Sequence, residues 1–460
     1  MSRSGGGARA GGSPRTTTAT MAESYLVIGG EGFVGHRMVE LLLERFPDAT
    51  VSSLDLVQRH FPDKLAAGTS RKWSFYSADL TSLDSLSSAF RQAGATCVFH
   101  TASPWTGSGA DVCEKVNVQG TQTVVDACVK EGVKKLVFTS SAGTVYDGVD
   151  LINVDERMPF PEKPIDPYNA TKAKAEQIVL EANGKNGLLT VALRPAGIFG
   201  PGDRQAVPGM MDVLKTGKTK FQVGENDNIF DWTYVDNVVH AHLIASQKLG
   251  QSVPLSVLED RLVPIDLTVP RRQLPTSDYR PPSLLEKEKE LDPSFVNNEK
   301  GDEPLGATRN RFDPYFPEFI AHAFPNLDFS DEKALADGSL QIPIAGQAYF
   351  ITNGEPVPFW DFPRALWAEY NGHVASWTLP LPAPLALGIA GIAETVMGWL
   401  GKTPNMTRGK IVYSTVNRYY NIEKARRILG YEPIVGVQEG IKRAVAWYKE
   451  NESSMQQKKA

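Results

Sequence analysis

A tyrosine and a lysine four residues apart could carry acid–base chemistry. Tyr168 and Lys172 open and close the run Y-N-A-T-K, and on a helix they would lie on one face, one turn apart. An ammonium beside a phenol lowers the phenol's pKa from its ordinary value of ~10. Ser141, 27 residues before Tyr168 in the run T-S-S-A-G, adds a hydroxyl that can hold the oxygen that gains or loses the proton. Together these three residues predict proton transfer on an alcohol or a carbonyl.

A glycine-rich turn near the start of the chain predicts a dinucleotide site. The β-prone run Y-L-V-I at 25–28 leads into G-G-E-G-F-V-G at 29–35, and an amphipathic helix follows. Such glycines let the backbone approach a pyrophosphate at the N-terminus of the helix. We expect the cofactor to contact Gly29, Gly32, Phe33, Val34 and Gly35.

An acid at the end of the next strand indicates which dinucleotide is bound. The apolar run 50–54 ends in Asp55, 20 residues after Gly35. A carboxylate there binds the adenosine ribose hydroxyls and repels a 2′-phosphate, which favours NAD. Arg59 lies close in sequence, so NADP stays the alternative.

Further strand-like runs end in polar or small residues. They lie at 73–76, 97–100 and 135–138. The carboxyl ends of parallel strands form the ligand crevice of a doubly wound sheet. We therefore predict an α/β protein with a Rossmann-type doubly wound parallel sheet, whose strand ends bring five further residues to the cofactor crevice: Asp79, Leu80, Thr101, Ala102 and Ser141.

The region from about residue 25 to 245 resembles the extended short-chain dehydrogenases/reductases. The run L-R-P-A-G-I-F-G-P-G at 193–202 is similar to the one that follows the Tyr/Lys helix in that family. The resemblance implies that Ser141, Tyr168 and Lys172 form the catalytic triad, with Ser140 as an alternative to Ser141. It also implies that Asn117 supports the site and that Pro195 lies near the nicotinamide.

Two later segments resemble one branch of that family, the 3β-hydroxysteroid dehydrogenases. Residues 230–242 and 346–360 are similar to the sterol-4α-carboxylate 3-dehydrogenases (decarboxylating). That resemblance implies NAD(P)-dependent oxidation of the 3β-hydroxyl of a 4α-carboxysterol, with loss of CO2, in ergosterol-type sterol biosynthesis. A cation should bind the substrate carboxylate, for which Arg204 and Lys220 are candidates. Asp236 and Asn237 are polar within an apolar run, and we expect them to serve the structure.

Three other functions compete with this one. The first is a different dehydrogenase/isomerase or ketone reductase of the same branch. The second is a nucleotide-sugar epimerase, which has no use for the apolar segment at 379–400. The third is a sensor or scaffold that binds NAD(H) without turnover; an intact set of Ser141, Tyr168 and Lys172 argues against it.

Charge and cysteine content exclude other classes of protein. The 460 residues carry a net charge of −5, with Lys and Arg scattered along the chain, so we expect no nucleic-acid partner. Cys97, Cys113 and Cys128 form no metal-ligand spacing and are odd in number, which indicates idle thiols in a reducing compartment. We predict no metal site.

The domain organisation follows from composition and from the family pattern. Residues 1–21 contain too few apolar residues to form an ordered structure, and we expect them to be disordered. We assign 22–200 to the NAD-binding domain, with parts of 225–245 joining its sheet. A smaller C-terminal α/β substrate domain comprises 201–250 and 343–450. Between its parts, 251–342 reads as an insertion that is rich in proline and charge, with 11 prolines from Pro254 to Pro325.

An apolar segment at 379–400 indicates contact with a membrane. Its only charged residue is Glu394, and the sixteen residues from Leu385 would span about 24 Å as a helix, short of the ~30 Å hydrocarbon core. We predict insertion into one leaflet, with a buried helix as the alternative. The resemblance implies the endoplasmic reticulum membrane with the catalytic domain on the cytosolic side, or lipid droplets. It also implies a sterol substrate, contacts with other C4-demethylation enzymes, and a homodimer.

Overall fold

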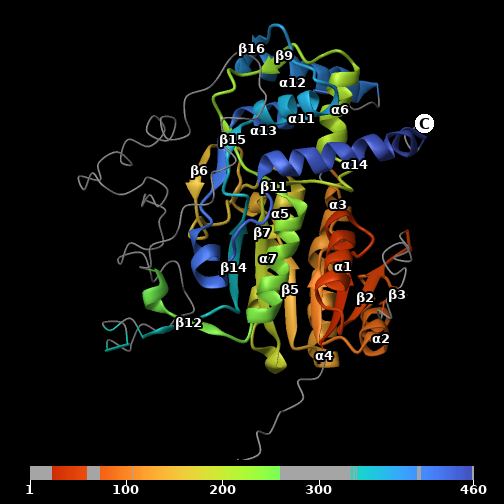
Figure 1. The fold of residues 1–460 in the computed structure, drawn as a ribbon, viewed down its shortest axis with the longest axis vertical. Helices are drawn as coiled ribbons and strands as arrows, with labels where there is room; N and C mark the ends of the chain where they lie inside the picture. The colour runs from red at the N-terminus through yellow and green to blue at the C-terminus, as the bar shows by residue number, and fades with distance from the viewer. Residues whose placement is uncertain are drawn as a thin grey trace, which may run out of the picture.

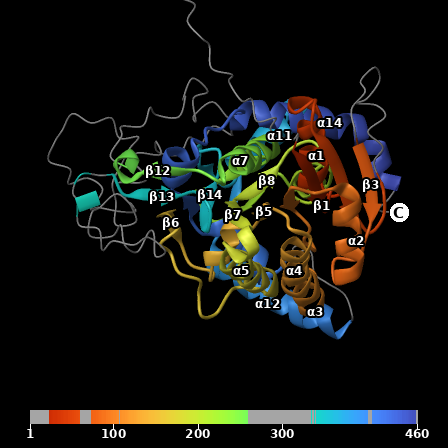
Figure 2. The same ribbon diagram turned by 90° about the horizontal axis from the view of Figure 1, so that it is seen from below.

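A seven-stranded parallel sheet forms the centre of the molecule. The computed structural model describes residues 23–59, 73–105, 107–258, 333–334, 337, 339–400 and 406–457. The strand order is β14-β7-β5-β4-β1-β2-β3. The strands are β1 Ser24–Ile28, β2 Thr50–Asp55, β3 Trp73–Ser77, β4 Cys97–His100, β5 Lys135–Thr139, β7 Leu189–Pro195 and β14 Gln347–Ile351. This is the predicted doubly wound sheet, and the strand order reverses between β1 and β4 (Figures 1 and 2).

Helices cover both faces of the sheet because both faces are apolar. Along β1, Tyr25 and Val27 belong to one hydrophobic cluster, and Leu26 and Ile28 belong to the other. Such all-apolar strands are typical of parallel sheets. One face is covered by α1 Phe33–Arg45 and α7 Val235–Lys248. The other is covered by α2 Leu83–Ala93, α4 Thr121–Glu131 and α5 Pro167–Glu181.

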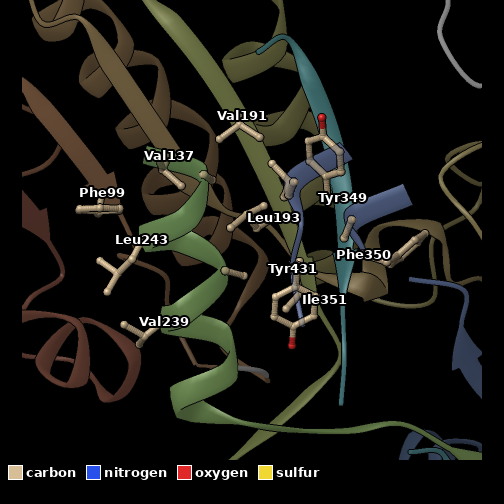
Figure 3. Packing of buried hydrophobic residues seen from close by; sticks show 14 of the residues in the cluster. Phe99, Val137, Val191, Leu193, Val239, Leu243, Tyr349, Phe350, Ile351 and Tyr431 are labelled. Carbon is tan, nitrogen blue, oxygen red and sulfur yellow. The ribbon is translucent and has the colours of Figure 1, made fainter. Parts of the chain in front are cut away.

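The α7 face packs against strands that are far apart in sequence. In Figure 3, Val239 and Leu243 of α7 lie on the side of the helix nearest Phe99 of β4, and they share one buried cluster with Val137 of β5, Leu193 of β7 and Ile351 of β14. These side chains are buried. Helix α7 therefore holds β14 to the rest of the sheet, although β14 begins about a hundred residues after α7 ends.

The smaller part of the molecule lies at one end of the central sheet (Figure 1). Its four-stranded sheet has the order β15-β10-β17-β6, and two strand pairs, β8–β11 and β9–β16, lie beside it. These strands are β6 Leu151–Val154, β8 Gly197–Phe199, β9 Phe221–Val223, β10 Ile229–Phe230, β11 Trp232–Tyr234, β15 Val357–Pro358, β16 Leu379–Leu381 and β17 Arg418–Tyr420. The helices of this part are α6 Ala206–Lys215, α11 Asp361–Asn371, α12 Ala383–Trp399, α13 Arg408–Thr415 and α14 Val437–Gln457. The π-helix η8 Ala425–Leu429 packs instead against α7 and β14 of the central part.

Buried polar side chains join the two parts of the molecule. Asn237 on α7 donates to the backbone oxygen of Val435 and to Asn353 Oδ1, each at 2.7 Å. Its own Oδ1 accepts from the backbone of Ile434 and Val435. Asp236, the preceding residue, pairs with Arg37 of α1 at 2.6 Å. Both residues serve the structure, as predicted.

The domain boundaries differ from those predicted in one respect. Parts of 225–245 do not join the central sheet: β10 and β11 pair within the smaller part, and α7 covers a face. The seventh strand is instead β14, from the segment assigned to the substrate domain. Both segments contain short β-prone runs, and only the long-range pairing of β14 with β7 decides which of them joins the central sheet.

The two ends of the predicted insertion meet. Strand β12 Ser252–Pro254 pairs antiparallel with β13 Gln341–Pro343, and the 3₁₀ turn η5 Leu255–Leu258 follows β12. The chain thus leaves and re-enters the fold at one place. Most of the insertion, and the N-terminal extension 1–21, lie outside the described residues.

Helix α12 exposes its larger apolar side chains. Ala386 and Ala390 are buried and pack against Ile411 of α13. The stripe at spacings of four and three residues faces outward instead: Leu385, Ile389, Ile392, Val396 and Trp399. Ile392 is 68% exposed and Trp399 is 84% exposed. A helix that closed the domain would bury this stripe and expose the alanines, so the buried-helix alternative is wrong. Within the described residues, no helix is both long and apolar enough to cross a membrane.

Candidate active site

The glycine turn between β1 and α1 is as tight as predicted. Gly29 has a φ of +78°, which favours glycine, and a Cβ there would lie 2.7 Å from the backbone of Ala102. A Cβ on Gly35 would lie 2.1 Å from Gly29 O. No side chain caps α1, so the first-turn amides of Phe33, Val34 and Gly35 face the turn as phosphate donors.

Two carboxylates gather where the adenosine ribose is expected. Asp55, at the end of β2, accepts hydrogen bonds from the backbone of Glu31 at 3.2 Å and of Leu56 at 2.8 Å. The carboxylate of Glu31 is buried and accepts from Ser53 Oγ at 3.1 Å and from the Arg59 backbone at 2.8 Å. Glu31 was not predicted from the sequence. An acid inside a phosphate-binding turn is nevertheless a signal, because it adds negative charge where a 2′-phosphate would sit.

The remaining predicted cofactor residues lie along the same edge of the sheet. Asp79 is exposed and accepts two hydrogen bonds from Thr81 at 2.9 Å, which lower the pKa of Asp79. The side chain of Leu80 packs on Gly120, and a Cβ on Gly120 would lie 2.5 Å from that side chain. Thr101 donates to Ile28 O at 2.8 Å and so holds the end of β4 to β1. The residues present therefore fit a bound dinucleotide.

Local capping fixes the helix that carries the tyrosine and the lysine. Asp166 caps α5 by accepting from Asn169 N at 2.7 Å, and Pro167 occupies the first turn, where a missing N–H costs nothing. One turn into α5, the ammonium of Lys172 is buried and donates to Thr139 O at 2.8 Å. It also lies 4.7 Å from the centre of the Phe138 ring. Lys172 therefore lies against the end of β5, where Ser141 follows.

A short 3₁₀ turn brings Ser141 to α5. Ser141 caps the turn η3, Ala142–Val145, by accepting from Gly143 N at 3.0 Å. A Cβ on Gly143 would lie 2.1 Å from Asn169 Oδ1, on the residue next to Tyr168. The lack of a side chain at Gly143 thus allows η3 and α5 to touch, and this contact brings together the two elements that carry the three predicted triad residues.

The neighbouring Ser140 has a different partner. Its hydroxyl donates to Glu176 Oε2 at 2.5 Å, and Glu176 pairs with Arg194 of β7 at 2.6 Å. All three side chains are buried. Ser140 therefore holds β5, α5 and β7 together, which leaves Ser141 as the serine with a hydroxyl for the substrate. Pro195, after Arg194, ends β7 and pairs with Ile351.

Burial keeps both catalytic side chains close to neutral. It raises the pKa of Tyr168 to about 12, and a hydrogen bond with the Ser103 side chain acts the other way. Burial lowers the pKa of Lys172 to about 7, and the Glu176 carboxylate opposes this. The predicted lowering of the Tyr168 pKa is therefore wrong for this structure, because desolvation dominates and the Lys172 ammonium donates to Thr139 O.

A chain of hydrogen bonds between hydroxyl and amide groups links Ser103 and Asn117 to Thr171, which donates to the backbone oxygen of Tyr168. Ser103 donates to Asn117 Oδ1 at 3.1 Å, and Asn117 Nδ2 donates to Thr171 Oγ1 at 3.0 Å. Asn117 lies in the π-helix η2 Glu114–Gly120, which continues the short helix α3 Ala110–Cys113. Local π-helices are frequent at functional sites, where they re-aim a side chain. Ser103 was not selected from the sequence; its position after β4 was the available signal.

Arg204 and Lys220 were the candidates for binding the substrate carboxylate. Neither lies beside the residues that contact Ser141, Tyr168 and Lys172. Arg204 is exposed in the loop between β8 and α6. The ammonium of Lys220 lies 5.0 Å from the Trp377 ring, near β9 and β16. Among the described residues, no group of three His, Cys, Asp or Glu side chains is placed to hold a metal ion.

Comparison with known proteins identifies the family. The model of the "3-beta hydroxysteroid dehydrogenase/isomerase family" matches residues 26–265. The chain belongs to the 3β-hydroxysteroid dehydrogenase family. Members of this family are NAD(P)-dependent dehydrogenases, which need a dinucleotide site of the kind that the glycine turn of this member fits.

Full-length relatives narrow the comparison. The chain is 36% identical to the sterol-4-alpha-carboxylate 3-dehydrogenase (decarboxylating) of Saccharomyces cerevisiae, covering 93% of this chain and 98% of the relative. It is 37% identical to the Schizosaccharomyces pombe enzyme of the same name, covering 92% and 97%. The Mus musculus enzyme of that name is 31% identical, covering 94% and 92%.

Solved structures share the fold of this family member. A UDP-glucose 4-epimerase of Thermotoga maritima superposes with a TM-score of 0.55 at 18% identity, covering 93% of this chain and 99% of that one. A dTDP-glucose 4,6-dehydratase of Bacillus anthracis, in complex with NAD, has a TM-score of 0.55 at 15% identity, covering 94% and 98%. They confirm the doubly wound sheet with a smaller C-terminal α/β part.

Proposed function

We propose that this protein oxidises the 3β-hydroxyl of a 4α-carboxysterol to the 3-ketone with NAD, and that the carboxylate then leaves as CO2. The observation that carries the proposal is the similarity to sterol-4-alpha-carboxylate 3-dehydrogenases over more than nine-tenths of both chains. The contact between η3 and α5 also supports the proposal, because these two elements carry Ser141, Tyr168 and Lys172, which could serve the oxidation of an alcohol.

The proton leaves through Tyr168. Its phenolic oxygen takes the hydroxyl proton of the substrate while Ser141 Oγ hydrogen-bonds the same substrate oxygen. Lys172 lies one turn along α5, and its charge favours the phenolate when the ammonium is protonated. Bound NAD would supply the hydride acceptor, held by the Gly29–Gly35 turn.

Loss of CO2 needs little from the protein. Oxidation at carbon 3 places a ketone β to the carboxylate, and the electrons of the breaking carbon–carbon bond flow into an enolate. Ser141 and Tyr168 already face that oxygen, so they can also stabilise the enolate and return a proton to it. No separate decarboxylation residue is required.

The acids beside the glycine turn support NAD over NADP. Asp55 and Glu31 place two carboxylates near the expected ribose, and Arg59 approaches them through its backbone N–H. A 2′-phosphate would meet two like charges there.

We further propose that the protein acts on the cytosolic surface of the endoplasmic reticulum membrane, with lipid droplets as the alternative. The exposed apolar stripe of α12 supports a lipid surface as its partner. The exposed Lys218 and the partly buried Lys220 lie just before β9, beside the stripe, which suits anionic headgroups, whereas Arg408 of α13 pairs with Glu394 of α12 at 2.7 Å. The proposed substrate is itself a membrane lipid.

One assay separates the competing functions. The protein is incubated with NAD and a 4α-carboxysterol, and NADH absorbance is followed together with CO2 release. Equal amounts of both products are expected. NADH without CO2, formed from carboxyl-free 3β-hydroxysteroids alone, would indicate the dehydrogenase/isomerase activity. Tight NADH binding without any turnover would indicate a sensor.

A further inference from the structure

A buried arginine in the smaller part of the molecule lacks an acidic partner. Arg418, the first residue of β17, is 9% exposed. It forms no ion pair with any described carboxylate, and its Nε has no hydrogen-bond partner in the described part of the chain. The other buried arginines of the region differ: Arg426 pairs with Glu423 and Glu432.

Aromatic rings surround the guanidinium instead of carboxylates. Its central carbon lies 4.1 Å from the centre of the Tyr146 ring, 4.7 Å from that of Tyr413 and 5.3 Å from that of Phe230. Cation–π contacts recover part of the cost of desolvating a guanidinium, but burying a charge without an acidic partner costs more than such contacts return. The fold alone does not explain why a charge is kept here, since a buried apolar side chain would stabilise the same site better.

The arginine is connected to the turn that carries the catalytic serine. The Tyr420 side chain hydrogen-bonds the guanidinium, and Tyr420 Oη donates to Ala142 O at 3.3 Å, next to Ser141. Tyr146 ends the same turn, five residues after Ser141. Arg418 thus lies against η3 from the side of the smaller part, while α5 contacts η3 from the side of the sheet.

A second polar group beside Arg418 is also unsatisfied. The hydroxyl of Tyr146 is buried and has no hydrogen-bond partner among the described residues. Burial raises its pKa to about 12, against the effect of Arg418, so the hydroxyl keeps its proton and can donate. Two buried donor atoms without an acceptor among the described residues, Arg418 Nε and Tyr146 Oη, one of them on a cationic group, form a site for an anion.

We propose that Arg418 and Tyr146 bind the carboxylate on carbon 4 of the substrate. This inference rests on the proposed function. The carboxyl carbon is two bonds from the carbon that is oxidised, so its cation must lie close to the turn that carries Ser141. Arg418 meets this requirement, and neither Arg204 nor Lys220 contacts that turn in the described structure. A guanidinium also suits a carboxylate, which it can bind through two parallel hydrogen bonds.

The test compares two substrates in the full-length protein. Values of kcat and KM are measured for a 4α-carboxysterol and for the same sterol without the carboxyl group. Arg418→Gln should raise KM for the carboxysterol about 30- to 300-fold, the effect of losing a buried charged pair, and change KM for the carboxyl-free sterol less than about threefold. Arg418→Lys should restore part of the loss, and Tyr146→Phe should show a smaller loss of the same kind.

Two controls separate this role from a structural one. Arg204→Gln, at the exposed candidate, should leave both substrates unchanged. The melting temperature of Arg418→Met should equal or exceed that of the wild type, because the variant removes an unpaired buried charge and keeps the packing. NADH affinity should be unchanged in every variant, which excludes the cofactor phosphates as the anion.

The failures are distinguishable. If Arg418→Gln raises KM equally for both sterols, or for neither of them, the assignment of Arg418 is wrong while the proposed function stands. A wild-type protein that oxidises the carboxyl-free sterol and ignores the carboxysterol contradicts the proposed function, and with it this inference.

Discussion

Burial acts on the charge of both catalytic side chains: it keeps the phenol of Tyr168 protonated and favours the neutral amine of Lys172. For oxidation the phenol must give up its proton. Below a pKa of about 12 the phenolate fraction rises about tenfold per pH unit, so kcat/KM for alcohol oxidation should rise with pH between about pH 6 and 9. A flat profile would show that Tyr168 does not limit the rate.

Replacing the phenol tests the same residue. Tyr168→Phe should lower kcat by about a thousandfold, the usual contribution of a positioned acid or base, because no other described side chain is placed to take the proton. The NADH dissociation constant should change by less than about threefold, because the phenol is not expected to contribute most of the cofactor's binding. Stopped-flow turnover and fluorescence titration measure the two effects, and a variant that stays active would contradict the mechanism.

Lys172 should reduce the stability of the fold. Its folded-state pKa of about 7 lies below the ordinary 10.5, so between these values the unfolded chain binds more protons, and stability rises with pH across that window. Below about pH 7 the cost of burying the charge is complete. Lys172→Met should therefore stabilise the protein by about 1–3 kcal/mol at pH 7, and by less near pH 10, while abolishing turnover.

Denaturant unfolding at the two pH values measures this difference. The matched control is Lys174→Met on the same helix, whose ammonium is exposed and pairs with Glu114. That variant should change stability by less than about 0.5 kcal/mol at either pH. A destabilised Lys172→Met at pH 7 would mean that the hydrogen bond to Thr139 O outweighs desolvation.

At the scale of elements, the crossing of β1 into α1 depends on glycine. Gly35→Ala places a methyl group 2.1 Å from Gly29 O, so the turn must open. We expect NADH affinity to fall at least about tenfold and the protein to lose about 1–3 kcal/mol of stability. Gly209→Ala in α6 is the matched control, because a Cβ there meets nothing within 4 Å and should stabilise the helix by about 0.5–1 kcal/mol. Calorimetry of both variants, with and without NADH, measures these effects; an unchanged affinity in Gly35→Ala would refute the tight turn.

At the scale of the molecule, the α12 stripe should hold the protein on lipid. Ile392→Glu puts a charge in the exposed stripe and should lower partition onto vesicles of phosphatidylcholine with some phosphatidylserine about 10- to 100-fold. Val149→Glu changes an equally exposed apolar residue on another surface and should have no effect. Flotation measures the partition, and sedimentation tests the rival that α12 joins two copies of the chain. Loss of self-association without loss of vesicle binding would favour that rival.

Local chemistry made part of this protein predictable. The strand, turn and helix around Gly29–Gly35, the acid at Asp55 and the Tyr168–Lys172 spacing are short-range patterns, because each depends on residues within one turn or one βαβ unit. The prediction of a dinucleotide cofactor and of Tyr168 and Lys172 as proton-transfer residues therefore follows from the sequence. The identity of the substrate came from resemblance, since no spacing of residues encodes a sterol.

Long-range packing decided the rest. Strand β14 and the run at 225–245 both contain short β-prone stretches, and only the pairing with β7 determines that β14 joins the sheet. Which face of α12 is buried depends on α13, because Ile411 of α13 packs against Ala386 and Ala390 of α12. The roles of Glu31, Ser103 and Arg418 come from neighbours distant in sequence, so the local signals at Glu31 and Ser103 were not sufficient to reveal them. Tertiary structure likewise reversed the expected pKa of Tyr168, since desolvation is a property of the folded surroundings and not of the Y-x-x-x-K motif.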